Sequence, residues 1–532
     1  MVPEHGGPLF GFQSLYRAWR DCRHGKGDSP ARWRFEADLE RNLFQLADEL
    51  SARRYQPSPS VCFVSNQPKR REIFAAHFRD RVVHHLLVRH LEPIFERRFI
   101  HDSYACRRGK GTLAAVDRVQ QFIRQVSANG SRRAWCLHLD VRSFFVRIDK
   151  AVLLRHAEGV INRSLALHGD DLCWLLRQIV LRDPSVDAHR IGHGFSAVPA
   201  HKSLYNTQNR TGLPIGNYSS QFLANVYLDP LDQFIKHTLK AKHYVRYVDD
   251  LLLMHPDRSR LEHWEVEIDR FLRERLALEL NPGARVLAPV TNGIDALGYV
   301  VHKDHRLLRR RTVRRWEASL SQARRQIVDS FRGVPVIRMP NSKAIARLLA
   351  RCASYEGLLR HADAHMLLER IEARHAWLRL LWVRERPGHL RRRADPRGCH
   401  ADLRSQWLKF RRLFPKCLIW MRLGRFWECF EGDARKWSLA TGLPLLNSPR
   451  PGFKHHVGFP NPPRLGALAR LSQAGIASVL LEQGQGYAGA LRRRSAWLLV
   501  GLEPDPSARW SLALATGKRS KIRIAPSYSS QT

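Results

Sequence analysis

The stretch Tyr244–Met254, YVRYVDDLLLM, places two adjacent aspartates, Asp249 and Asp250, between two runs of strand-forming residues. Side chains alternate between the two faces of a strand, so two neighbouring carboxylates favour a tight turn between strands. The flanking runs, which are rich in Val, Tyr and Leu, predict such a hairpin. Adjacent like charges repel each other unless water screens them or a cation lies between them. An ordinary solvated turn and a cation site are both open at this point, and the rest of the chain decides between them.

A third carboxylate, Asp140, ends the apolar run AWCLHLD at residues 134–140, which predicts a buried strand. One aspartate at a strand end and two on a facing hairpin can hold divalent cations, since Mg²⁺ prefers carboxylate and phosphate oxygens. Two such ions ~3.5–4 Å apart activate a 3′-hydroxyl and stabilise a leaving pyrophosphate in an in-line transfer. The three aspartates are therefore the predicted catalytic and metal-binding residues, with two Mg²⁺ ions as the expected cofactors and Mn²⁺ as the alternative.

The overall charge points to a polyanionic partner. The 532 residues include 89 Lys and Arg against 49 Asp and Glu, which gives a net charge of +40. Nucleic acid is the first expectation and an anionic membrane a distant second. No apolar run reaches the ~18 residues of a membrane-spanning helix, and the first residues lack the pattern of a secretory signal. The nine scattered cysteines fit reduced thiols, so we expect a cytoplasmic protein without a structural zinc site or a membrane partner.

The sequence blocks around the three aspartates follow one another in a recognisable order. They read LHLDVRSFF, GLPIGNYSSQFLANVYLDPLD, YVRYVDDLLLM and IDALGYVV, with SYACRRGKGTLAAV before them and SYEGLLRHADAH after them. In this order and spacing they resemble the reverse transcriptases over about residues 30–380. The resemblance implies an α+β right-hand polymerase with fingers, palm and thumb. It also implies template RNA, an RNA–DNA hybrid and dNTPs as partners and substrates.

The resemblance assigns roles to further residues of this chain. Phe145, five residues after the first aspartate, matches the bulky gate that excludes a ribose 2′-hydroxyl, whereas its neighbour Phe144 fits a core position better. Lys69 and Arg71 match the cations of the fingers that grip the incoming triphosphate, and Tyr247 would line the primer terminus. One block departs from the family pattern, because LNPGARVL stands where many relatives have Asn-Pro-Lys-Lys, so the acid that protonates the leaving group stays unassigned.

The block IGNYSSQ, residues 215–221, distinguishes subclasses of the family. Retron and group II intron members carry Gln-Gly followed by Ser-Pro at the matching place, whereas this block resembles the reverse transcriptases of diversity-generating retroelements. Those enzymes copy a template RNA with frequent errors at adenines and work with a small accessory protein. We therefore predict that Gly216 and Gln221 contact the substrate and that Ile215 and Gln221 loosen base discrimination. The alternative is that Ile215 and Gln221 only pack the helix.

Residues 404–500 resemble a second family, the N-terminal mismatch-recognition domain of MutS. The resemblance rests on Gly424-x-Phe426-x-Glu428 and on the later blocks GDA, VGFP and LLEQ. In MutS the matching Phe stacks on a mispaired base and the matching Glu hydrogen-bonds to it, and one such stack contributes ~1–3 kcal/mol. Arg425 replaces an acidic residue and makes the motif more basic. The alternative is that Phe426 belongs to the core of a docking module.

The chain is thus predicted to contain six segments in order. They are N-terminal helices and fingers (1–133), palm with fingers segments (134–310), helical thumb (311–383), basic linker (384–403), mixed α/β MutS-like module (404–505) and tail (506–532). The leading hypothesis is an error-prone reverse transcriptase of a diversity-generating retroelement with a fused mismatch-binding or distorted-duplex-binding module. A defence-associated or retron-type reverse transcriptase that makes cDNA from a non-coding RNA is the second. A nucleic-acid-binding protein with a decayed polymerase is the third.

Overall fold

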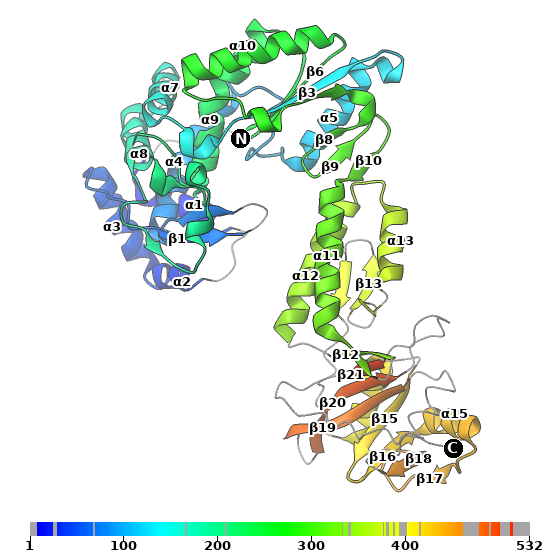
Figure 1. Cartoon of the computed structure of the whole chain (residues 1–532). Coiled ribbons are helices and arrows are strands. Elements are labelled where there is room, and N and C mark those ends of the chain that lie inside the picture. The colour runs from blue at the N-terminus through cyan, green and yellow to red at the C-terminus, as the bar shows by residue number, and fades with distance from the viewer. Residues whose placement is uncertain are drawn as a thin grey trace. The chain divides into compact units, whose positions relative to one another are not determined.

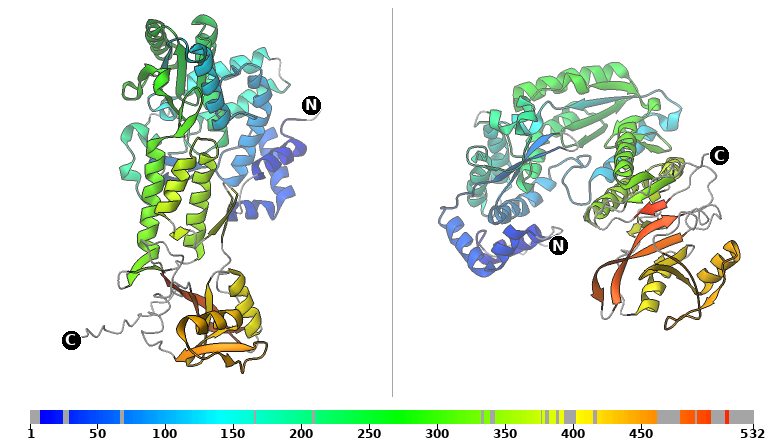
Figure 2. Two further views of the ribbon diagram at one scale, coloured as in Figure 1. Left: turned by 90° about the vertical axis from the view of Figure 1, so that its right-hand side faces the viewer. Right: turned by 60° about the horizontal axis from the view of Figure 1, so that its bottom comes forward.

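The computed structural model forms two compact units, Met1–His305 and Arg306–Thr532 (Figures 1 and 2). None of the described helices combines the length and apolar character needed to cross a bilayer. The structure describes residues 8–24, 29–66, 70–164, 167–207, 210–331, 334–338, 342–375, 377–378, 382–386, 389–392, 402–413, 417–460, 478–488, 491–500 and 511–513.

The first unit begins with helices that gather around one long helix, α4. These helices are α1 (Phe12–Arg23), α2 (Pro30–Glu36), α3 (Leu39–Ser51) and α4 (Phe78–Glu96). The side chain of Ser29 accepts a hydrogen bond from the backbone N–H of Arg32 at 3.3 Å, and Pro30 follows at the first helical position. This capping chemistry explains why α2 starts there. α1 and α2 both contact α4, which buries the apolar stripe that the sequence predicts.

A hairpin between α3 and α4 interrupts these helices. It consists of β1 (Val61–Ser65) and β2 (Arg71–Ala75), which pair antiparallel from Val61↔Ala75 to Ser65↔Arg71. The short strand β4 (His189–Arg190) joins β1 in parallel. Arg71 therefore stands at the first position of β2, next to the turn of the hairpin.

The four-stranded sheet β5-β6-β3-β7 packs against α10 (Arg258–Leu276) and α5 (Thr112–Val126) in the first unit (Figure 1). Its strands are β3 (Trp135–Asp140), β5 (His243–Tyr247), β6 (Asp250–His255) and β7 (Val286–Pro289). Leu137 pairs with Leu253 and Leu139 with Leu251, and all four side chains are buried in the core. The buried strand and the hairpin that the sequence predicts are thus confirmed, and they are neighbours in one sheet.

Six further described helices precede this sheet or connect its strands, and α5 and α10 pack against it. They are α5 (Thr112–Val126), α6 (Phe144–Arg147), α7 (Lys150–Arg163), α8 (Gly169–Leu181), α9 (Tyr218–Gln233) and α10 (Arg258–Leu276). The predicted helix after the GLPIG turn is α9, and it continues into a π-helical turn, η5 (Phe234–Thr238). Short 3₁₀ turns are η1 (Ala128–Gly130), η2 (Phe195–Ala197), η3 (Ala200–Lys202), η4 (Leu204–Asn206), η6 (Pro282–Ala284) and η7 (Val290–Asn292). The first unit ends with β8 (Ile294–Ala296) and β9 (Tyr299–Val301), which pair antiparallel.

The second unit starts with the strand β10 (Arg306–Leu308) and three helices. These are α11 (Arg310–Ile327), α12 (Ser342–Leu359) and α13 (His365–Arg374), and Trp316 of α11 stacks on Tyr355 of α12 at 5.2 Å. The predicted helical segment 311–383 also contains strands, β11 (Val328–Phe331) and β12 (Val334–Arg338). The basic segment predicted as a linker includes most of a hairpin, β13 (Trp382–Arg386) with β14 (His389–Arg392).

Nine described strands form the C-terminal sheet, in the order β11-β12-β21-β20-β19-β15-β16-β18-β17. The elements not yet given are α14 (Leu403–Leu413), β15 (Leu418–Leu423), β16 (Phe426–Phe430), α15 (Glu431–Thr441), β17 (Leu446–Asn447), β18 (His455–Pro460), β19 (Ser478–Ala488), β20 (Leu491–Val500) and β21 (Ser511–Ala513). Trp420, Trp427 and Trp437 are fully buried beside the sheet, which explains the cluster of tryptophans in this part of the sequence. The segment predicted as a tail contributes β21 to the sheet, while 514–532 lies outside the described residues.

Candidate active site

A two-residue turn presents the paired aspartates. β5 ends at Tyr247 and β6 begins at Asp250, so Val248 and Asp249 form the turn between them. Asp250 lies directly opposite Asp140 in the ladder between β6 and β3. The backbone N–H of Val141 donates to the carbonyl oxygen of Asp249 at 3.2 Å. The sheet register thus brings the three predicted aspartates together at one end of the two strands.

Two side chains that the sequence interpretation missed contact Asp140 and Asp250. The side-chain amide of Asn281 donates to Asp140 Oδ2 at 2.8 Å, and its backbone N–H donates to the Asp140 carbonyl oxygen, also at 2.8 Å. His138 Nε2 lies 3.0 Å from Asp250 Oδ1. Strand alternation could have identified His138, since it stands two residues before Asp140 on the same face of β3. Asn281 is the Asn of LNPGARVL, so this part of the motif acts on the site through Asp140.

The three carboxylates form one electrostatic cluster. Burial, together with the charges of Asp250 and Asp140, raises the pKa of Asp249 to about 6, while Arg71 acts in the opposite direction. A shift of this kind reports negative charges close together in a poorly solvated place, where a cation would be neutralising. Among the described residues, no group of three or more His, Cys, Asp or Glu side chains is arranged so that it could hold a metal ion. A bound Mg²⁺ would therefore need water and substrate phosphates as ligands beside these carboxylates, as it usually does in proteins.

The region after Asp140 differs from a continued strand. Ser143 adopts a left-handed φ of +49°, and the short helix α6 starts at Phe144. Phe144 is buried in the core, as the sequence predicts, although a helical turn and not strand alternation separates it from Phe145. Phe145 is partly buried, packs edge-on against Phe144 at 5.4 Å, and accepts a hydrogen bond at its carbonyl oxygen from Leu213 N–H at 2.8 Å. This fixes the backbone at the predicted sugar gate.

The sequence model of the reverse transcriptase (RNA-dependent DNA polymerase) family matches residues 65–301. This range contains all three aspartates, the β1–β2 turn and the sheet. Residues 65–301 are a reverse transcriptase domain. The chain is accordingly an enzyme whose polymerase domain carries the fold and the aspartate cluster described above.

Two curated relatives match part of the chain. The protein YkfC of Escherichia coli K12 is 24% identical over 311 residues, which cover 52% of this chain and 74% of that protein. The mitochondrial nuclear intron maturase 1 of Arabidopsis thaliana is 27% identical over 288 residues, covering 43% of this chain and 39% of the maturase. The chain therefore spans well under half of the length of the maturase.

Solved telomerase structures show a weak overall likeness. The telomerase of Candida albicans with a TWJ fragment of telomeric RNA matches at 10% identity with a TM-score of 0.34, over 54% of this chain and 55% of that chain. The apo telomerase of Candida tropicalis without its C-terminal domain matches at 11% identity with a TM-score of 0.35, over 49% and 59% of the two chains.

Within the reverse transcriptase domain, the β1–β2 hairpin lies against the block that precedes α9. Phe74 N–H of β2 donates to the carbonyl oxygen of Ile215 at 2.8 Å, and Ala76 N–H donates to Asn217 Oδ1 at 3.3 Å. Gly216 between them has a φ of +125°, and a Cβ there would lie 2.6 Å from the Phe74 carbonyl oxygen. Gly216 is therefore required for this close approach. The predicted contact of Gly216 with the substrate stays a prediction.

The structure describes three of the four other predicted substrate contacts. Arg71 is exposed at the start of β2, whereas Lys69 lies outside the described residues. Gln221 is exposed in the first turn of α9, where its Oε1 accepts a weak hydrogen bond from Cys106 Sγ at 3.5 Å. The Tyr247 hydroxyl lies 3.0 Å from Thr112 Oγ1 at the start of α5. This contact links the hairpin that carries the aspartates to the segment SYACRRGKGTLAAV, residues 103–116.

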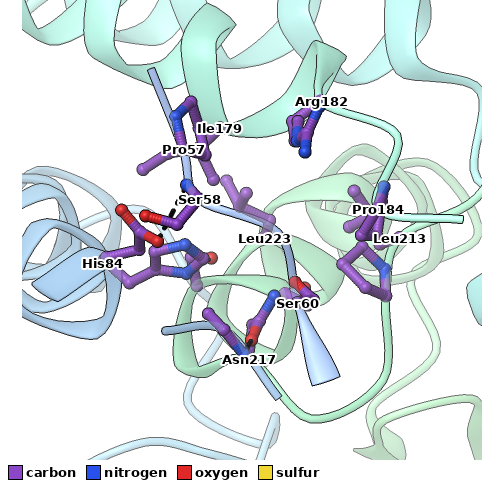
Figure 3. A pocket seen from close by; sticks show the side chains of 15 residues that line it. Pro57, Ser58, Ser60, His84, Ile179, Arg182, Pro184, Leu213, Asn217 and Leu223 are labelled. Carbon is purple, nitrogen blue, oxygen red and sulfur yellow. Dashed lines mark hydrogen bonds between the residues drawn. The ribbon is translucent and has the colours of Figure 1, made fainter. Parts of the chain in front are cut away.

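A small cavity in the reverse transcriptase domain is not lined by Asp140, Asp249 or Asp250 (Figure 3). Its volume is about 30 Å³, which holds a water molecule but no nucleotide. His84 and Ser219 line it, and His84 Nδ1 lies 2.7 Å from Ser219 Oγ. We therefore regard it as a packing feature between α4 and α9.

The predicted nucleic-acid contacts of the C-terminal module differ in accessibility. Arg425 stands in the β15–β16 turn, and Phe426, the first residue of β16, is 50% exposed, so it is not a core residue. Glu428 is buried, and both of its carboxylate oxygens pair with Arg450, at 2.6 Å (Nη2–Oε1) and 3.2 Å (Nε–Oε2). The Glu428 carboxylate is thus occupied within the protein.

Proposed function

We propose that this chain synthesises cDNA from a template RNA, with Asp140, Asp249 and Asp250 at the reacting centre. The observation that carries the proposal is the meeting of these three carboxylates at one end of the β3–β6 ladder, within electrostatic reach of Arg71. Two Mg²⁺ ions held by the aspartates would activate the primer 3′-hydroxyl and stabilise the leaving pyrophosphate.

The chain's own residues then position the reactants. Arg71 brings positive charge toward the aspartate cluster, where a triphosphate would lie. The Phe145 ring would exclude a ribose 2′-hydroxyl, and the fixed backbone at that position keeps its place. Tyr247, held through Thr112, would line the primer terminus. Since phosphoryl transfer depends mainly on positioning and charge neutralisation, these few contacts suffice.

Primer extension on an RNA template with dNTPs and Mg²⁺ tests this function. We expect extension by the wild-type protein and none by Asp249→Asn/Asp250→Asn, a nearly isosteric variant that removes the charges but keeps the turn. Binding of the RNA–primer hybrid is the control and should be retained. Equal extension by the two proteins would contradict the assignment of the aspartates, and absence of extension by the wild type with RNA and hybrid bound would contradict the polymerase function.

We further propose that the enzyme belongs to the error-prone class found in diversity-generating retroelements. The support is the IGNYSSQ block, whose Ile215 carbonyl lies against β2, the strand that begins with Arg71. Restoring the common pattern with Ile215→Gln/Gln221→Pro should lower misincorporation opposite adenine, measured by sequencing the products. Unchanged errors would mean that the two residues only pack the helix. Accurate synthesis by the wild type would instead favour the defence-associated or retron-type class.

For the C-terminal module we propose binding of mismatched or distorted duplexes through the β15–β16 turn. The support is the exposed Phe426 ring beside Arg425. Because a stacked aromatic contributes ~1–3 kcal/mol, Phe426→Ala should weaken binding to a mismatched duplex by about 5- to 150-fold. The paired state of Glu428 implies that any contact to a base by this carboxylate requires release from Arg450. Equal affinity of the variant and the wild type, measured by fluorescence anisotropy, would leave docking as the role of this module.

A further inference from the structure

The turn that carries Asp249 has an unfavourable backbone conformation. Val248 adopts a left-handed φ of +56°. A β-branched residue is a rare outlier in this region, because its side chain crowds the backbone. Such a conformation persists only where surrounding contacts enforce it. Something other than the turn's own preference must therefore hold Val248 in place, and with it the two aspartates that follow.

The contact that holds the turn comes from a buried arginine two residues earlier. Arg246 is fully buried, and its Nη1 donates to the Val248 carbonyl oxygen at 3.1 Å. The same nitrogen donates to Asn225 Oδ1 at 2.9 Å. A guanidinium can make both contacts because its donors have a fixed, planar arrangement.

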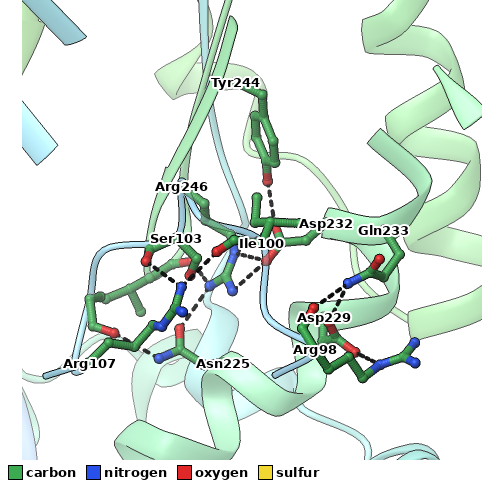
Figure 4. Close-up of polar contacts among 12 residues, drawn as sticks. Arg98, Ile100, Ser103, Arg107, Asn225, Asp229, Asp232, Gln233, Tyr244 and Arg246 are labelled. Atoms are coloured by element: carbon green, nitrogen blue, oxygen red, sulfur yellow. Dashed lines mark hydrogen bonds and ion pairs between the residues drawn. The ribbon is translucent and has the colours of Figure 1, made fainter. Parts of the chain in front are cut away.

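The other side of the guanidinium is clamped by a buried carboxylate. Arg246 Nη2 and Nε donate to Asp232, at 2.7 Å to Oδ2 from Nη2 and 2.8 Å to Oδ1 from Nε, and neither side chain is exposed (Figure 4). Tyr244 donates its hydroxyl to Asp232 Oδ1 at 2.8 Å. Burial by itself disfavours the charged guanidinium, but the Asp232 carboxylate outweighs this and raises the pKa of Arg246. The arginine therefore stays charged and cannot rotate away.

Helix α9 carries both side chains that bind the Arg246 guanidinium. Asn225 and Asp232 are seven residues apart, so they lie two turns apart on one face of α9. Asn225 also donates through its side-chain amide to the Ala105 carbonyl oxygen at 2.8 Å. The Arg246 carbonyl oxygen accepts a hydrogen bond from Tyr104 N–H at 3.0 Å, which adds a main-chain connection to the segment that contains Ala105. The arginine is thus fixed by a helix and by a neighbouring chain segment.

We propose that Arg246, clamped by Asp232 and Asn225, is a positioning residue that holds the Val248 turn and thereby sets the orientation of Asp249 and Asp250. This inference rests on the proposed polymerase function. Buried ion pairs often contribute no net stability, since desolvation of the two charges offsets their attraction. A role in placing the catalytic turn accounts for an ion pair that stability alone does not require.

The helix offers a matched control pair one turn away. Asp229 of α9 is as buried as Asp232, and Arg98 pairs with it, but the bonds of Arg98 do not reach the turn (Figure 4). The test compares Arg246→Met/Asp232→Leu with Arg98→Met/Asp229→Leu. Each double variant removes both charges of its pair and leaves neither partner unpaired, so both should fold, although Arg98 is 37% exposed and Arg246 is fully buried.

We expect only the Arg246 variant to lose catalysis. Because small misplacements of reacting groups are costly, its kcat should fall about 100-fold while the KM for dNTP and the thermal midpoint change little. Its half-saturating Mg²⁺ concentration should rise, and hydrogen exchange of peptides from residues 244–254 should become at least about 10-fold faster. The control variant should keep wild-type values for kcat and for exchange in these peptides.

A second variant protects the test against misfolding. Arg246→Lys keeps the charge but cannot reach both Asn225 and Val248, so its kcat should also fall. Adding Val248→Asn should recover at least about 10-fold of that loss, since Asn adopts the left-handed conformation more readily. Unchanged kcat and exchange in the Arg246 variants, or equal changes in the control pair, would overturn the proposal. If the wild type itself does not extend primers, the polymerase function fails, and hydrogen exchange at the turn alone decides the positioning role.

Discussion

At the scale of single residues, His84 illustrates how burial changes a titration. Its ring is buried between α4 and α9, with Nδ1 2.7 Å from Ser219 Oγ. Burial lowers the pKa of His84 to about 3, and the charges of His85 and Arg81 act in the same direction. Below pH 6.5 the unfolded chain therefore binds a proton at this position that the folded chain does not.

This difference predicts a pH-dependent stability. The contribution of neutral His84 is fully present above about pH 6.5 and decreases as the pH falls toward 3, since the unfolded state takes up the proton. Between pH 7.5 and 5.5 we expect this group alone to lower the free energy of unfolding by about 1.4 kcal/mol. Urea unfolding of the wild type and of His84→Gln at both pH values measures it, because Gln can still bond to Ser219 but does not titrate. Equal losses in both proteins would show that other groups cause the change.

The residues of the two candidate sites, the aspartate cluster and the C-terminal module, divide into those that sequence can identify and those that it cannot. The three aspartates and Phe144 follow from spacing and from apolar patterning, and His138 was within reach through strand alternation. Asn281, Asp232 and Arg450 were not, because each acts on a residue that is 14 to 141 positions away in sequence or lies in another element. A polar side chain shows its type in the sequence, but its partner is fixed only by the tertiary fold.

At the scale of elements, local patterns predict hairpins and helices well. The β5–β6 hairpin lies where the runs of strand-forming residues on either side of the paired aspartates place it, because its two strands are close in sequence. Strands β11 and β12 form a local antiparallel hairpin that the prediction of a helical segment overlooked. Strand β21 was missed, since it pairs with β12 across more than a hundred residues. Pairing at such distance is a property of the fold, not of the local sequence.

The contact between β2 and the segment before α9 leads to a prediction at this scale. Gly216→Ala would place a Cβ 2.6 Å from the Phe74 carbonyl oxygen and also strain a φ of +125°. Because the clash is with the backbone of β2 and not with the end of a flexible side chain, the strand itself should shift and carry Arg71 with it. We expect a loss of about 1–3 kcal/mol in unfolding free energy and a higher KM for dNTP.

Gly111→Ala is the matched control for this clash. Gly111 has a φ of +117°, but a Cβ there would have no neighbour within 4 Å. The strain from φ is therefore similar in the two variants, and the difference between them reports the clash with β2. Urea unfolding and steady-state kinetics of both proteins measure it. A KM for dNTP that rises equally in both would mean that the close approach at Gly216 does not position Arg71.

At the scale of the whole molecule, one sheet of the second unit includes strands from both its helical segment and its C-terminal module. Strands β11 and β12 follow directly on α11, yet they belong to the same sheet as β15–β21. Val336, Ile337 and Arg338 of β12 pair in parallel with Ser511, Leu512 and Ala513 of β21. The sequence suggested a boundary at the basic segment before residue 404, whereas the sheet connects the residues on both sides of it.

This connection predicts that truncation after residue 403 damages the part of the second unit that remains. The cut removes β21 and leaves β12 as an exposed strand edge, and unpaired edges promote association between chains. We expect the truncated protein to aggregate and to lose primer extension, as followed by light scattering and by activity. Phe426→Ala in the full chain is the control, since it alters the exposed β15–β16 turn but leaves the sheet intact. A monomeric, fully active truncated protein would show that β11 and β12 do not need the C-terminal strands, and that the boundary suggested by the sequence is a true domain boundary.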